Sequence, residues 1–311
     1  MSVEFEIAGD QIDGARHYQE DAYIFNHLGE LDNGKKCALV IMADGMGGHT
    51  GGNVASNTVV ATFNKSFQTS FLAKEASVAL TDSLHRANER IRAAVKETPA
   101  LRGMGCTMVS VYLEGDNLFW VSVGDSHLYL IRDRKLIKQN ADHSYGAYLD
   151  MMKDQGVEIG HIGISRNMLM SAMTGEEISS IDVSETPVKM CPGDRVVVAS
   201  DGLDTLSLDA IIQYSAKSKT AKECVYNLLK AVESEHKINQ DNTTLVVVDI
   251  KERIKRESPN EQQPESVQPA SRAADAKVRD KLKEQWPYKR AVWLIILAII
   301  IAVGYFAWQT G

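Results

Sequence analysis

Four aspartates adjoin short apolar runs, and this pattern constrains the fold more than any other feature of the chain. The runs span 37–43, 117–124, 196–200 and 244–248, and the acids beside them are Asp44, Asp125, Asp201 and Asp241. Apolar runs of this length predict buried strands. A lone carboxylate at the end of a buried strand is destabilising, because loss of water disfavours its charge. The recurrence therefore predicts a shared compensating charge, of which a cluster of divalent cations is the simplest.

Composition narrows the functional class. The 311 residues carry a formal net charge of -7, with the acidic excess in residues 1–250 and a basic excess in residues 251–311. An acidic globular part argues against nucleic acid as the main partner, although ordinary solubility explains the same balance. The four cysteines lie far apart without a CxxC spacing. That distribution favours a reducing cytosol over a disulfide framework.

The last sixty residues differ from the rest. Residues 251–290 are polar and nearly free of large apolar side chains up to Trp286, which predicts a disordered linker after a globular domain of residues 1–250. Residues 291–308 carry no charge and would span about 27 Å as a helix, close to the thickness of a bilayer core. Lysine and arginine precede this segment, so we expect an anchor in the inner (cytoplasmic) membrane with the globular domain facing the cytoplasm. The alternative to a membrane anchor is that residues 291–308 form a buried helix.

Periodicity and turn residues predict an α+β fold in which helices cover antiparallel sheets. In the stretch 75–95, Leu80, Leu84, Ala87 and Ile91 recur on one helix face. The expected helices are 55–71, 75–95, 145–155, 207–214 and 219–235; the expected strands are 3–8, 20–27, 36–43, 105–113, 118–123, 126–132, 135–138, 194–199 and 244–250.

Nine short motifs accompany the four acids. They are RHYQED (16–21), MADGMGGH (42–49), GMGCT (103–107), VGDS (123–126), DHS (142–144), RN (166–167), PGDR (192–195), SDGL (200–203) and QDNTT (240–244). In this order they resemble the metal-dependent protein phosphatases of the type 2C class, the PPM family, and its bacterial members in particular. The resemblance covers roughly residues 7–250. It implies a four-layer α-β-β-α sandwich of two antiparallel sheets flanked by helices.

The resemblance also implies metal ligands. Asp44 would bridge two ions, with the carbonyl of Gly45 on one of them and Asp201 on the other. The remaining implied ligands are Asp241 beside Asp201, Glu20 and Asp21 through bound waters, and Asp125 with Asp201 at a third ion. Oxygen ligands favour Mn²⁺ or Mg²⁺ over zinc. The alternative for these acids is a role in turns at strand ends.

Two further residues have implied roles in catalysis. Arg16 occupies the family position that binds the substrate phosphate, for which a guanidinium has a matching geometry. His49 could relay a proton, or instead cap the following helix. Two departures from the family pattern, His127 and Ser171 in place of basic residues, leave substrate preference open.

The resemblance predicts a phosphoprotein phosphatase that hydrolyses phosphoserine and phosphothreonine by a metal-activated water and opposes a bacterial Ser/Thr kinase. The alternative is a pseudophosphatase, a membrane-tethered module that binds phosphoproteins without turnover. A dehalogenase-type phosphatase would need an Asp-x-Asp nucleophile motif, and a P-loop NTPase a GxxxxGK[ST] loop. The sequence contains neither.

Overall fold

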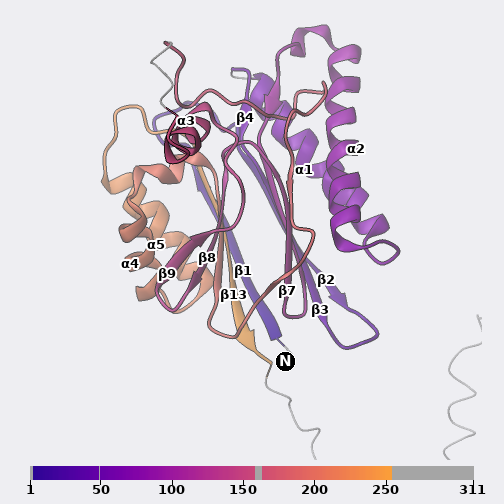
Figure 1. The fold of residues 1–311 in the computed structure, drawn as a ribbon, viewed down its shortest axis with the longest axis vertical. Coiled ribbons are helices and arrows are strands. Elements are labelled where there is room, and N and C mark those ends of the chain that lie inside the picture. Colours follow the sequence, from indigo (N-terminus) through magenta and orange to yellow (C-terminus); the bar gives the residue numbers. More distant parts are fainter. Residues whose placement is uncertain (1–2, 49, 158–162, 254–311) are drawn as a thin grey trace, which may run out of the picture. The chain divides into compact units, whose positions relative to one another are not determined.

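The computed structural model describes residues 3–48, 50–157 and 163–253 (Figure 1). The chain divides into two units, Met1–Ile254 and Lys255–Gly311. The second unit lies outside the described residues, and with it most of the expected linker and the whole expected membrane helix at 291–308. Within the described part, no helix combines the length and apolar character that a membrane span requires.

Two antiparallel sheets form the centre of the first unit. One has the order β1-β13-β12-β8-β9 and the other the order β10-β7-β6-β3-β2, with β11 also paired to β7. The strands of the first sheet are β1 (Val3–Ile12), β13 (Thr243–Glu252), β12 (Arg195–Ala199), β8 (His127–Arg132) and β9 (Lys135–Lys138). Those of the second are β10 (Asp182–Val183), β7 (Asn117–Val123), β6 (Met108–Glu114), β3 (Lys36–Ala43), β2 (Ala22–Glu30) and β11 (Val188–Lys189).

Helices cover the outer face of each sheet, which gives four layers (Figure 1). The long helices α1 (Thr50–Ser70) and α2 (Ala76–Glu97) pack on the second sheet, and α4 (Leu208–Lys217) with α5 (Ala221–Ser234) packs on the first. A shorter helix, α3 (Tyr145–Asp154), follows β9. The predicted α+β class of antiparallel sheets and helices is confirmed.

Burial on both faces explains why β3 is apolar at nearly every position. Successive side chains of a strand point to opposite faces of the sheet. Leu39 and Ile41 accordingly enter the core beneath α1 and α2, whereas Val40 and Met42 enter the core between the sheets. β13 behaves in the same way, with Val247 facing α5. The apolar runs beside the aspartates are therefore central strands.

The structure corrects three expectations about local structure. Helix α1 begins at Thr50 rather than near residue 55; the two glycines in its first turn have low helix propensity, so the sequence did not predict this start. The expected strand 105–113 is broken at Thr107 into β5 (Gly105–Cys106) and β6, and β5 pairs with the short β4 (Gly45–Met46). Strands β10 and β11 were not predicted, since each has only two residues.

A buried ion pair joins β12 to β13 at the end of the sheet away from the aspartates. Arg195 Nε donates to Asp249 Oδ1 at 2.6 Å and a terminal nitrogen donates to Oδ2 at 2.9 Å. The same guanidinium donates to the carbonyls of Ser215, in the last turn of α4, and Ser218, which follows α4. The pair therefore ties the outer helix layer to the sheet.

We expect Arg195→Met to lower the free energy of unfolding by about 3 kcal/mol, because Asp249 would stay buried without its main partner. Urea denaturation measures this change. Lys189→Met is the matched control, since it removes the more exposed pair with Asp116 and should change stability by less than about 1 kcal/mol. Equal effects of the two substitutions would contradict the structural role of Arg195.

Candidate metal centre

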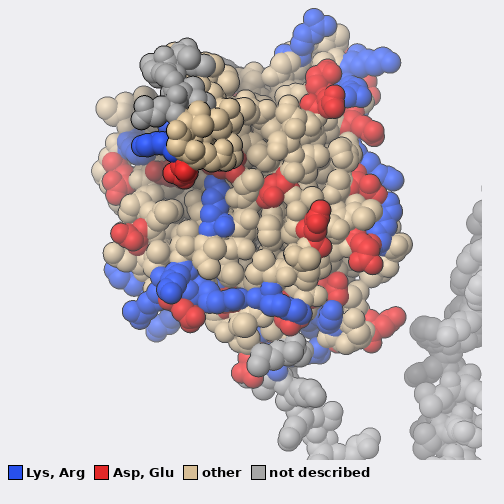
Figure 2. Space-filling view, viewed as in Figure 1, with Lys and Arg blue, Asp and Glu red and all other residues tan. Residues whose placement is uncertain are grey.

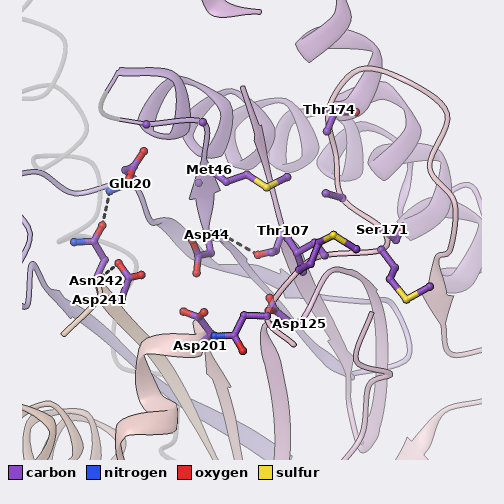
Figure 3. Close-up of a pocket in the computed structure, with 18 of the residues that line it drawn as sticks. Glu20, Asp44, Met46, Thr107, Asp125, Ser171, Thr174, Asp201, Asp241 and Asn242 are labelled. Atoms are coloured by element: carbon purple, nitrogen blue, oxygen red, sulfur yellow. Dashed lines mark hydrogen bonds between the residues drawn. The ribbon is translucent and has the colours of Figure 1, made fainter. Parts of the chain in front are cut away.

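The predicted acids meet at one edge of the two sheets. Asp44 follows β3 and Asp125 follows β7, while Asp201 begins the short helix η2 (Asp201–Thr205) directly after β12. Asp241 lies just before β13. In antiparallel sheets the end of one strand adjoins the start of the next, so these positions converge. Figure 3 shows Asp44, Asp201 and Asp241 around one space, with Glu20 above Asp241 in this view.

This edge borders a pocket of about 710 Å³. One wall carries the carboxylates and the other is a chain segment after α3. The lining includes Arg16, Glu20, Asp44, Gly45, Asp125, Asp201, Asp241 and residues 167–172. The structure thus brings together seven of the nine predicted site residues.

Backbone hydrogen bonds hold Asp44 in place. Its amide donates to Thr107 Oγ1 at 3.2 Å, and its carbonyl accepts from the amide of Thr107 at 2.9 Å. Thr107 Oγ1 is in turn 2.7 Å from Ser126 Oγ. The carboxylate is left to face the pocket (Figure 3). Burial, followed by the charge of Asp21, raises the pKa of Asp44 well above its ordinary value.

Gly45 and Gly52 allow the chain to pack closely beside Asp44. A Cβ at Gly45 would overlap the carbonyls of Gly52 and Glu20, and a Cβ at Gly52 would overlap Glu20 Oε1. Glycine at both positions lets the start of α1 press against the Glu20 loop. Close packing therefore explains Gly52 in the first turn of α1.

Asn242 fixes the position of the Glu20 loop. Its Oδ1 accepts from the amide of Glu20 at 2.9 Å, and its Nδ2 donates to the carbonyls of Asp13 and Tyr18. Ser56 Oγ donates to the Glu20 carbonyl at 2.5 Å. Sequence reasoning assigned no role to Asn242, although its place directly after Asp241 was a usable signal.

Asp21 points away from the pocket. It does not line the cavity, and its Oδ2 accepts from Thr244 Oγ1 at 2.7 Å. Burial raises its pKa to about 6, and nearby Asp201 and Asp241 contribute to this shift. Of the two acids expected to act through bound water, only Glu20 lines the pocket.

Arg16 and Asp241 form an ion pair at the mouth of the site. The guanidinium donates to Asp241 Oδ2 at 2.8 Å, and Asp241 Oδ1 accepts from the amide of Asn242. Both side chains are about two-fifths exposed, so the guanidinium remains accessible to solvent. This pairing raises the pKa of Arg16.

Asp125 and Asp201 form the lower part of the carboxylate wall (Figure 3). Burial raises the pKa of Asp125 to about 6, with added repulsion from Asp201 and Asp142. Burial also raises the pKa of Asp201, and Asp241 increases this shift. His49, the proposed proton relay, lies outside the described residues.

The oxygen atoms that line the pocket are the kind of ligand that binds a hard divalent cation. The described lining contains carboxylates and carbonyl groups but neither histidine nor cysteine, a set that favours Mg²⁺ or Mn²⁺. The raised pKa values of Asp44 and Asp201 reflect burial and mutual repulsion, which a cation would relieve. Among the described residues, however, no group of three or more His, Cys, Asp and Glu side chains is already arranged as a metal site. Coordination would therefore require the carboxylates to move closer together.

Comparison with known sequences gives a match over residues 14–245 to the family described as Protein phosphatase 2C. The serine/threonine protein phosphatase PstP of Mycobacterium tuberculosis is 31% identical over 219 residues, 68% of this chain and 40% of PstP. The serine/threonine phosphatase stp of Listeria innocua is 29% identical over 222 residues, 70% of this chain and 84% of that protein. The chain thus matches less than half the length of the mycobacterial relative.

A solved structure shares the fold. The catalytic domain of a serine/threonine protein phosphatase PstP, in complex with two manganese ions, aligns with a TM-score of 0.66 and 28% identity. The alignment covers 81% of this chain and all of the PstP domain. A relative with the same architecture therefore binds two metal ions.

The protein stripped of divalent cations should lose stability as the pH rises. The pKa of Asp125 is about 6 in the folded state against an ordinary value of 3.8, so the fold favours the protonated carboxyl. This contribution is complete below 3.8 and disappears as the pH rises through about 6. The free energy of unfolding that is lost in this way between about pH 5 and about pH 7.5 amounts to about 1 kcal/mol.

In the variant Asp125→Asn, the free energy of unfolding measured by urea denaturation should change with pH by about 1 kcal/mol less over this range. Asp133→Asn, an exposed acid in the turn between β8 and β9, is the control and should leave it unchanged. An unchanged slope in Asp125→Asn would mean that Asp125 titrates normally in the folded protein.

Proposed function

Since the chain belongs to the protein phosphatase 2C family, we propose that it hydrolyses phosphoserine and phosphothreonine in proteins. The Ser/Thr phosphatases among its relatives support this proposal. The observation that carries it is the convergence of Asp44, Asp201 and Asp241 with Arg16 in one open pocket. Phosphate-ester hydrolysis requires charge neutralisation and a positioned nucleophile, and this set of side chains can provide both.

Two Mn²⁺ or Mg²⁺ ions would be held by Asp44, the carbonyl of Gly45, Asp201 and Asp241, with Glu20 acting through water. Bound ions lower the pKa of water and offset charge on the phosphoryl group. Asp21 would support the site from behind through its bond to Thr244. A third ion at Asp125 and Asp201 remains part of the proposal.

Arg16 would orient the substrate. Its guanidinium is about two-fifths exposed at the pocket mouth, where it can exchange Asp241 for two phosphate oxygens. Asn242 keeps the loop that carries Arg16 and Glu20 in place through its bonds to Asp13, Tyr18 and Glu20. A proton relay through His49 stays a prediction.

The alternative of a pseudophosphatase finds no support in the comparisons, whose named relatives are phosphatases. Asp44, Asp201 and Asp241, whose loss would have favoured it, all line the pocket. We therefore retain hydrolysis as the proposed activity.

We expect the full-length protein to release phosphate from phosphothreonine peptides only with Mn²⁺ or Mg²⁺, and EDTA to abolish this release. Asp44→Asn should lower kcat/KM at least about a hundredfold, because even the partners of metal ligands contribute 10–100-fold. Asp133→Asn is the control and should leave turnover intact. Activity that survives EDTA, or an active Asp44→Asn protein, would exclude the metal mechanism.

We also propose that residues 291–308 anchor the protein in the cytoplasmic membrane, with residues 251–290 as a linker and the phosphatase domain in the cytoplasm. The uncharged stretch 291–308 and the basic residues before it support this proposal. A Ser/Thr kinase in the same compartment would supply the substrates.

Deletion of residues 291–311 should move the protein from the sedimented membranes to the supernatant without loss of phosphatase activity. Fractionation followed by an activity assay measures both effects. If the truncated protein still sediments with membranes, residues 291–308 are not its anchor.

A further inference from the structure

The wall of the pocket opposite the carboxylates carries exposed apolar side chains. We call residues 167–174 the methionine segment, because Met168 and Met170 line the pocket from it. Their side chains are 45% and 46% exposed, although most large apolar residues of the described chain are buried. Met46 extends toward this segment from the carboxylate side (Figure 3). Exposed apolar side chains gathered in a functional pocket indicate a binding surface.

The backbone fixes which side chains of the segment face outward. Leu169 pairs with Ser144 and Met173 pairs with Cys106, both in antiparallel bridges. Ser171 and Met173 are buried, whereas Met168 and Met170 are exposed. The amide of Met170 also donates to the carbonyl of His143 at 2.8 Å. The two methionines are therefore held outward by main-chain bonds.

The charges that line the pocket disfavour substrates with an acidic residue next to the phosphorylated residue. Arg16 is the only Lys or Arg among the described lining residues, and it lies at the carboxylate wall. The opposite side adds another acid, Glu177. On the face shown in Figure 2, the surface between α3 and α2 likewise carries few charged side chains. An acidic residue beside the phosphate would meet repulsion here, whereas an apolar one would meet methionine.

We propose that the methionine segment binds an apolar side chain that flanks the phosphorylated residue. The preferred substrates would be phosphoproteins with a large apolar residue, such as leucine, within two positions of the phosphoserine or phosphothreonine. This inference rests on the proposed function. The phosphate is held at the carboxylate wall, so the adjoining peptide is what reaches the opposite wall of the same pocket. Methionine suits this role because its flexible side chain adapts to different apolar shapes.

The test compares phosphothreonine peptides that differ only beside the phosphothreonine, with glycine, leucine or aspartate at the flanking positions. With the Mn²⁺-loaded full-length protein, kcat/KM should be about tenfold higher for the leucine peptide than for the glycine peptide, and lowest for the aspartate peptide. In the double variant Met168→Gln/Met170→Gln, the ratio of kcat/KM between the leucine and glycine peptides should fall to about one. Glutamine preserves length and is tolerated on an exposed surface.

Met151→Gln is the matched control, because Met151 is 48% exposed on α3 but does not line the pocket. It should retain the preference for leucine. Equal rates for the leucine and glycine peptides, or a preference that survives the double variant, would overturn the inference and leave the phosphatase proposal standing. Absence of hydrolysis for every peptide would instead refute the proposed function itself.

Discussion

The crowding of carboxylates at one edge of the two sheets is the constraint on which the rest of the site depends. Asp44 lies between strands that remove water from it, and other acids face it across the pocket. Like charges in such surroundings repel strongly. The structure holds them there through backbone contacts, such as those of Thr107 with Asp44, and through the guanidinium of Arg16. A cation bound among these carboxylates would offset their repulsion.

The central strands and most helices could be predicted from the sequence, because their patterns are strong. β3 is apolar on both faces, and α2 carries a regular apolar stripe that is buried against the second sheet. The errors fall where tertiary contacts override local preference. Gly52 stands in the first turn of α1 because Glu20 leaves no room for a larger residue, and Thr107 interrupts a strand because its amide bonds to Asp44.

The gathering of the acids could also be predicted, since each adjoins a strand. Their individual orientations could not. Asp21 turns toward Thr244 while its neighbour Glu20 lines the pocket, and this depends on how the loop packs. The ion pair between Arg16 and Asp241 joins residues 225 positions apart. The support given by Asn242 likewise depends on side-chain geometry that no local pattern encodes.

The short strand β5 links the two walls of the pocket. Cys106 pairs with Gly45 on one side and with Met173 on the other, so the backbone after Asp44, β5 and the end of the methionine segment form a miniature ladder. Adjacent strands in such a ladder lie about 4.8 Å apart. The separation of the walls at this point is thus fixed by main-chain geometry at about two strand spacings. A substitution that changed the side chains of the pocket would therefore leave the spacing of its walls at β5 in place.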